Sequence, residues 1–236
     1  MPVAPASDRV RAEWRARIAA EYGSAAITQH LVLWLIQVGA PPDVIDDGLR
    51  IVKDELEHSR LSHETYVAAG GGAPPALDRN TLALPRRNDL PLELDIVRTA
   101  TQVFALGETV AVPLFKHLRE QCTIAPARAA LDRILRDEVR HRDFGWTLLD
   151  WLATTPLAPQ LAKLVEQDLP AMFTQLEHNY GEAGPGVASP ISADDRAWGL
   201  APAAEYAEIL ARTFERDYLP RFSARGIDPA PAWAAR

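Results

Sequence analysis

The sequence predicts an all-α protein: a four-helix bundle of two antiparallel hairpins joined by a long crossover, with additional C-terminal helices. Three observations predict this fold. Apolar residues recur at the spacing of one helix face in four long stretches. Short turns containing Gly or Pro join these stretches in two pairs, and a Gly- and Pro-rich segment at about 70–91 separates the pairs. We expect one domain over 1–236, with the core bundle at about 8–155 and a helical extension at about 156–225.

In the first hairpin, acidic residues interrupt two otherwise apolar helix stripes. The first helix is expected from about 8 to 38, and Glu21 lies in the middle of its stripe. The second is expected from about 42 to 69, with Glu55 and His58 on its stripe. Glu21 precedes the turn by roughly as many residues as Glu55 follows it. The two carboxylates should therefore lie at a similar depth in the bundle.

The second hairpin repeats this pattern. Its helices are expected at about 92–121 and 126–153. Glu108 interrupts the apolar stripe of the first, and Glu138 and His141 lie on the stripe of the second. Because residues three apart share one helix face, each Glu-x-x-His pair can direct a carboxylate and an imidazole at the same point.

Prolines and glycines punctuate the rest of the chain. Pro113 lies inside the expected third helix and should kink or bulge it beside Glu108. A fifth helix is expected at about 159–180, and the Gly- and Pro-rich stretch 181–192 is expected to be a mobile loop, able to cover the site. A last helix, with Pro202 in its first turn, should run to about residue 218 and precede a loosely held tail.

The inward-facing acids and imidazoles together predict a site for two metal ions. Di-iron and di-manganese bundles bind their metals with one Glu from each of two helices and a Glu-x-x-His from each of the other two. Four buried carboxylates would be very costly alone, whereas two divalent cations bring them near neutrality. The alternative is that these acids simply lie on solvated helix faces. The predicted ligands are Glu21, Glu55, His58, Glu108, Glu138 and His141.

Two aspartates are candidates for a supporting role. Asp54 and Asp137 each precede a ligand Glu, and a metal-binding imidazole usually donates its other ring N–H to a carboxylate. Each Asp is expected to serve the histidine of the partner helix, and the alternative is plain surface charge. His178 on the fifth helix could add a ligand if that helix leans over the site.

These residues resemble the ferritin-like di-iron carboxylate superfamily over roughly residues 8–155. The resemblance rests on Glu21, Glu108, the DELEH stretch at 54–58 and the DEVRH stretch at 137–141. DEVRH is similar to the Asp-Glu-x-Arg-His motif of bacterial multicomponent monooxygenase hydroxylases, whereas DELEH has Glu57 in place of the Arg. The plan is also similar to the ribonucleotide reductase small subunit, aldehyde-deformylating oxygenase and rubrerythrins. Residues 156–236 carry no such resemblance.

The resemblance implies a non-haem di-iron oxygenase or oxidase. Such an enzyme activates O2 at a carboxylate-bridged pair of iron ions, oxidises a small organic substrate and takes electrons from an external donor. Manganese is an alternative metal, because it accepts the same ligands. The alternatives are a peroxide-handling protein, a ferroxidase or iron-storage protein, and a helical module without catalysis. A rubrerythrin would normally carry a Cys-rich electron-transfer site, and the chain has one cysteine, Cys122.

Composition excludes several other classes. The net charge of −7 and the lack of a basic run argue against nucleic acid or an anionic membrane as partner. The longest apolar run, 31–38, is too short to span a bilayer. A single cysteine excludes an internal disulfide framework. With no signal-peptide pattern at its N-terminus, the chain is expected in the cytoplasm, and a homodimer is left open.

Overall fold

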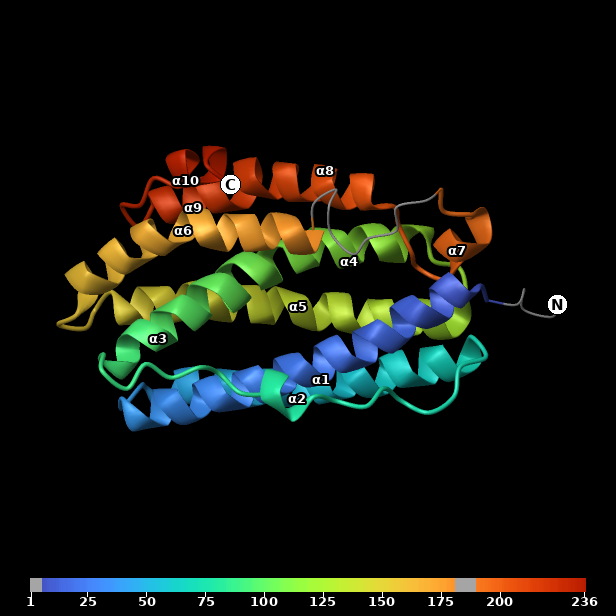
Figure 1. Cartoon of the computed structure of the whole chain (residues 1–236), viewed down its shortest axis with the longest axis horizontal. Helices are drawn as coiled ribbons and strands as arrows, with labels where there is room; N and C mark the ends of the chain where they lie inside the picture. The colour runs from blue at the N-terminus through green and yellow to red at the C-terminus, as the bar shows by residue number, and fades with distance from the viewer. Residues whose placement is uncertain (1–5, 181–189) are drawn as a thin grey trace. The chain divides into compact units, whose positions relative to one another are not determined.

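The computed structural model describes residues 6–180 and 190–236, and this part of the chain is helical without β-strands (Figure 1). The all-α prediction is therefore confirmed. No helix within these ranges is long and apolar enough to cross a membrane. The elements are α1 (Asp8–Gln37), α2 (Pro42–Ala68), η1 (Arg79–Thr81), α3 (Leu92–Thr99), η2 (Ala100–Glu108), α4 (Thr109–Gln121), α5 (Ala125–Leu152), α6 (Ala158–Tyr180), α7 (Ala193–Ala197), α8 (Ala203–Thr213), η3 (Phe214–Tyr218), α9 (Leu219–Ser223) and α10 (Ala230–Ala234).

These helices form two compact units, and both units are discontinuous in sequence. Among the described residues, unit 1 contains 6–85, 115–137 and 191–201, and unit 2 contains 86–114, 138–180, 190 and 202–236. Helices α4 and α5 each begin in one unit and end in the other. The single domain expected from the sequence stays a prediction.

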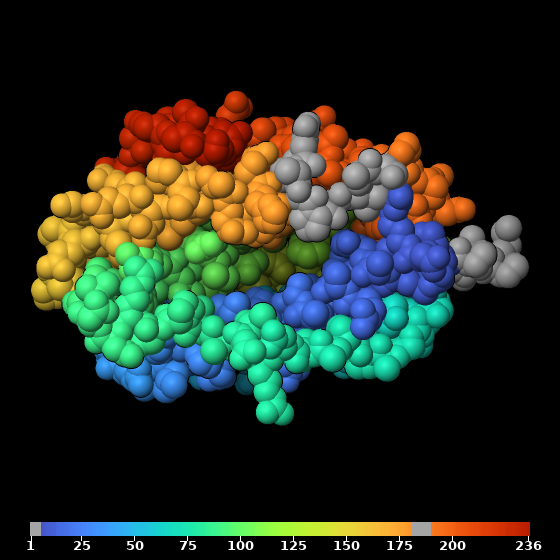
Figure 2. Space-filling model, in the orientation of Figure 1, coloured from blue at the N-terminus to red at the C-terminus, as the bar shows by residue number. Residues whose placement is uncertain are grey.

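In unit 1, α1 and α2 form an antiparallel pair, and the crossover after α2 lies along them (Figures 1 and 2). Ser7 caps α1 by accepting a hydrogen bond from the Val10 N–H at 3.2 Å. Gly39 ends it with a φ of +71°, a conformation that favours glycine. Side chains of the expected apolar stripe of α1 are buried throughout: Trp14, Ile18, Ala25, Thr28, Val32 and Leu35.

Unit 2 contains α3, η2, the first part of α4, the last part of α5, α6 and the C-terminal helices, which are α8, η3, α9 and α10. An aromatic cluster joins α6 to these C-terminal helices. The Phe214 and Trp233 rings are stacked with centroids 4.4 Å apart, and Trp233 meets Phe173 edge-on at 5.2 Å. The prediction that the tail is loosely held is therefore wrong, because Trp233 of α10 packs into this cluster.

The third expected helix is irregular upstream of its proline. Nine residues before α4 form the π-helical segment η2, and α4 then continues through Pro113. A proline ring crowds the carbonyl four residues earlier, which is that of Thr109, the first residue of α4. The expected distortion beside Glu108 is thus a π-helical stretch that ends at Glu108.

Candidate metal centre

The first group of predicted ligands lies in unit 1, where α1 supplies Glu21 and α2 supplies Glu55 and His58. All three side chains are buried: 8% of Glu21, 2% of Glu55 and none of His58 is exposed. Burial follows from the apolar stripes, which turn these positions toward the interior of the helix pair. Ionisable groups are rarely buried to this extent unless they are paired or bind a metal.

The spacing of these three side chains suits a metal ion. His58 Nδ1 lies 3.6 Å from a Glu21 oxygen and 3.7 Å from a Glu55 oxygen. One ligand atom from each residue lies within 4.8 Å of the others. The Nδ1 distances exceed the usual hydrogen-bond length of about 2.7–3.2 Å. Ligand atoms about 2.1 Å from one ion are about 3–4 Å from each other, so the donor set fits a cation.

The pKa values show how strongly this group attracts positive charge. Burial, partly offset by contact with His58 and reinforced by the nearby charge of Glu55, raises the pKa of Glu21 to about 8. Burial opposes the charged form of His58, but its contacts with Glu21 and Glu55 outweigh this and raise its pKa to about 10. Without a metal, protons on these residues would balance the carboxylate charge.

Asp137 faces the other nitrogen of His58. Its carboxylate lies 3.3 Å from His58 Nε2. Although burial disfavours its charged form, a hydrogen bond from Arg133 and the contact with His58 lower the pKa of Asp137. A carboxylate can only accept, so Nε2 carries the proton and Nδ1 faces the acids as a potential ligand. Arg133 also reaches Asp54 at 3.4 Å, which links the two aspartates.

The second group of predicted ligands lies in unit 2, where η2 ends at Glu108 and α5 supplies Glu138 and His141. Glu138 is 2% exposed, His141 is fully buried and Glu108 is half-buried. His141 Nδ1 is 3.6 Å from a Glu138 oxygen, and a ligand atom of Glu108 lies within 4.8 Å of one of His141. In both Glu-x-x-His pairs the histidine Nδ1 thus faces the glutamate carboxylate at nearly the same distance.

The π-helical segment is the feature of this site that the sequence did not predict. It ends at Glu108, and π-helical turns in proteins are frequently found at functional sites. Pro113 was the only signal in the sequence, and it did not indicate nine residues of altered hydrogen bonding.

The other histidines do not join either group. His178 is exposed on α6, and His30, His63 and His117 are half-buried. The extra ligand considered at His178 is not seen. The loop expected at 181–192 lies outside the described residues except for its last three.

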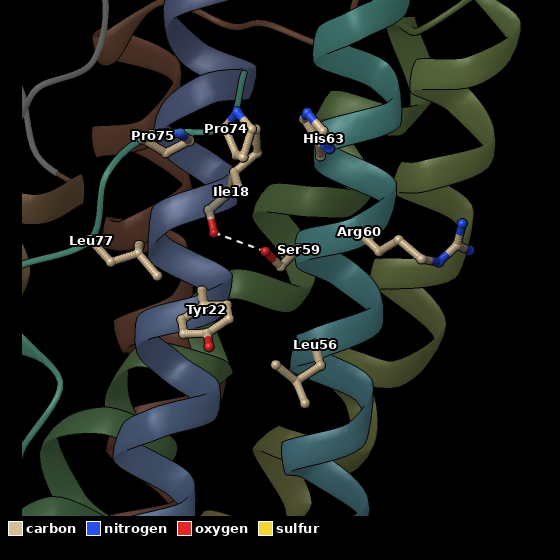
Figure 3. A pocket seen from close by; sticks show the side chains of 9 residues that line it. All are labelled: Ile18, Tyr22, Leu56, Ser59, Arg60, His63, Pro74, Pro75 and Leu77. Atoms are coloured by element: carbon tan, nitrogen blue, oxygen red, sulfur yellow. Dashed lines mark hydrogen bonds between the residues drawn. The ribbon is translucent and has the colours of Figure 1, made fainter. Parts of the chain in front are cut away.

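A groove of about 330 Å³ lies between the α1–α2 pair and the crossover (Figure 3). Three of its lining residues are sequence neighbours of ligands: Tyr22, Leu56 and Ser59. Ser59 Oγ donates a 3.0 Å hydrogen bond to the Ile18 carbonyl across the floor of the groove (Figure 3).

Comparison with protein-family models, with curated proteins and with solved structures finds no match to this chain. The case for a metal site therefore rests on the donor set. Carboxylate oxygens and imidazole nitrogens suit iron, manganese and zinc.

Cys122 is buried and forms no disulfide, and burial raises its pKa.

Proposed function

We propose that the two groups together form one dinuclear metal centre inside a ferritin-like four-helix bundle. The observation that carries this proposal is the repeated, buried Glu-x-x-His geometry, accompanied in each unit by one further Glu. Helix α5 supports combining them, because Asp137, which contacts His58, and Glu138, which contacts His141, are consecutive residues.

Charge balance supports two divalent ions. The six ligands carry four negative charges when ionised, and each buried, uncompensated carboxylate would cost several kcal/mol. Two divalent cations cancel these charges while the imidazoles stay neutral. The raised pKa of Glu21 shows that its buried carboxylate takes up a proton readily when no cation is bound.

We propose that the protein is a non-haem di-iron oxygenase or oxidase acting on a small organic substrate, with an external electron donor. Bound iron would supply the redox chemistry that O2 reduction needs. The chain itself would hold the ions, fix the His58 tautomer through Asp137 and keep water away with the apolar residues around the ligands. Manganese fits the same donors.

Metal stoichiometry tests the centre. The purified chain, stripped with a chelator and reloaded anaerobically with Fe²⁺, is expected to hold two ions. Glu138→Ala and His141→Ala are each expected to lose at least one, measured by elemental analysis after gel filtration. The control is His178→Ala, which replaces an exposed histidine. Full occupancy in both ligand variants would reject the assignment.

The reaction class needs a separate measurement. For an oxygenase or oxidase, the Fe²⁺-loaded protein should consume O2 repeatedly when supplied with a chemical reductant, and His141→Ala should not. Iron uptake far beyond two ions per chain would indicate storage instead. Rapid peroxide breakdown by the manganese-loaded protein would indicate a peroxide-handling protein.

A further inference from the structure

The candidate ligand Glu108 depends on an unusual backbone. It is the last residue of η2, whose π-helical hydrogen bonds are less favourable than those of an α-helix over nine residues. Such a segment persists only where its surroundings determine it. The contacts around η2 in unit 2 therefore bear on where the Glu108 carboxylate lies.

Helix α5 approaches η2 directly at Gly145, one turn after His141. A Cβ atom at Gly145 would lie 2.6 Å from the Ala105 backbone nitrogen and 2.6 Å from the Phe104 Cβ. No side chain fits at that distance, and the nearest atoms belong to backbone or to a Cβ, which cannot swing away. Phe144 meets Phe104 edge-on at 5.1 Å beside this contact. The absence of a side chain at Gly145 therefore allows α5 to approach the η2 backbone closely at this point.

The C-terminal helices hold η2 from another direction. Tyr218 is fully buried, and its hydroxyl donates a 2.6 Å hydrogen bond to the carbonyl of Leu106. The same carbonyl accepts from the Thr109 N–H at the end of η2. Leu106 is itself fully buried. Tyr218 thus satisfies a backbone acceptor two residues before Glu108.

A third contact follows Glu108 immediately. Trp146 Nε1 donates to Thr109 Oγ1 at 3.0 Å, and both side chains are buried. Leu106 before Glu108 is therefore bonded to Tyr218, and Thr109 after it is bonded to Trp146. The half-buried Glu108 lies between these two residues in the chain.

We infer that Gly145 and Tyr218 are positioning residues for Glu108, and that the C-terminal helices belong to the support of the metal centre. This inference rests on the proposed dinuclear site. Gly145 sets the distance from η2 to α5, which carries Glu138 and His141. Tyr218 holds the Leu106 carbonyl and with it the end of the π-helical segment. The helical extension expected at about 156–225 thus has a role at the site.

Cobalt binding tests the inference, because Co²⁺ absorbs visible light according to its ligand geometry. Wild-type protein, Gly145→Ala and Tyr218→Phe are titrated with Co²⁺, with circular dichroism recorded on each. The two variants are expected to keep the wild-type helix content. The affinity of one of the two ions should fall about 10–100-fold, as is typical when a supporting residue is lost. The visible spectrum of that ion should change, which a merely structural role would not cause.

Matched controls separate positioning from general effects. Gly23→Ala adds the same methyl group on α1, where no atom beyond the adjoining residues and backbone of α1 lies within 4 Å of the new Cβ. Tyr66→Phe removes a hydroxyl from a half-buried tyrosine of α2. Both are expected to bind two Co²⁺ ions with the wild-type spectrum.

The outcomes decide between the inference and the function on which it rests. A wild-type chain that binds no Co²⁺ would overturn the dinuclear site itself. If the wild type binds two ions and Tyr218→Phe leaves their affinities and the spectrum unchanged, the positioning role is overturned. The dinuclear site is not affected by that result. An equal loss of affinity at both ions would also overturn the positioning role. If Gly145→Ala fails to fold, Tyr218→Phe decides, because it removes a single oxygen atom.

Discussion

His58 illustrates how single residues shape this site. Its Nδ1 faces two carboxylates at 3.6 and 3.7 Å, while its Nε2 is held at 3.3 Å by Asp137. The imidazole thus has one nitrogen for a cation and one for a fixed hydrogen bond. Asp137 is in turn kept ionised by Arg133, four residues before it on α5.

Asp137→Asn should weaken metal binding without unfolding the chain. The amide cannot supply the negative charge that fixes the His58 tautomer, so the affinity of the ion at Glu21, Glu55 and His58 should fall about 10–100-fold. Isothermal titration with Mn²⁺ measures this. Asp132→Asn is the matched control, because Asp132 also lies on α5 and pairs with an arginine, Arg119, but is exposed. Equal losses in both variants would contradict a specific role for Asp137.

The metal-free protein should lose stability as the pH rises from 6.5 to 8. In the folded state, Glu21 keeps its proton to about pH 8 and His58 to about pH 10, against ordinary values of 4.5 and 6.5. The folded chain therefore binds more protons than the unfolded chain over this interval, so the free energy of unfolding falls with pH. Metal binding releases these protons, so the stabilisation by metal should grow over the same interval.

Urea denaturation in the presence of a chelator at pH 6.5 and pH 8 measures this dependence. Glu21→Gln is the control, because it removes one of the two groups and should reduce the slope. A metal-free protein that becomes more stable toward pH 8 would show that protons do not replace the cations at this site.

At the scale of elements, the sequence predicted the long helices well because periodicity and caps are local. The expected starts and ends of α1, α2, α5 and α6 agree with the structure within about two residues. The same stripes correctly placed Glu21, Glu55, His58, Glu138 and His141 on buried faces.

The two π-helical segments were not predicted because tertiary contacts determine them. In the described chain, η2 and η3 are each followed closely by a proline, Pro113 and Pro220. A proline indicates where a helix must adjust, but not how many residues change their hydrogen bonding. The approach of Gly145 to Phe104 and the bond from Tyr218 to Leu106 join residues about 40 and 112 positions apart, which no local pattern encodes.

At the scale of the whole molecule, the division of the chain was the least predictable property. Each unit draws on segments far apart in sequence, and α4 and α5 contribute to both. A hydrophobic stripe shows which face of a helix is buried, but not which other helix covers each part of it. The unit to which each ligand belongs follows from this division and not from the motifs alone.

Metal binding should therefore protect both units at once. If one dinuclear centre takes ligands from α1, α2, η2 and α5, saturating Mn²⁺ should slow hydrogen exchange in all four elements, whereas η1, which has no buried residue, serves as an internal control. At an ion concentration about 100 times the dissociation constant, the gain is about 2.7 kcal/mol per site. For a chain of 236 residues each site then raises the melting temperature by about 5–10 °C, so two ions should raise it by about 10–20 °C. Protection confined to α1 and α2, or to η2 and α5, would instead indicate that the two groups bind metal separately or that only one of them does.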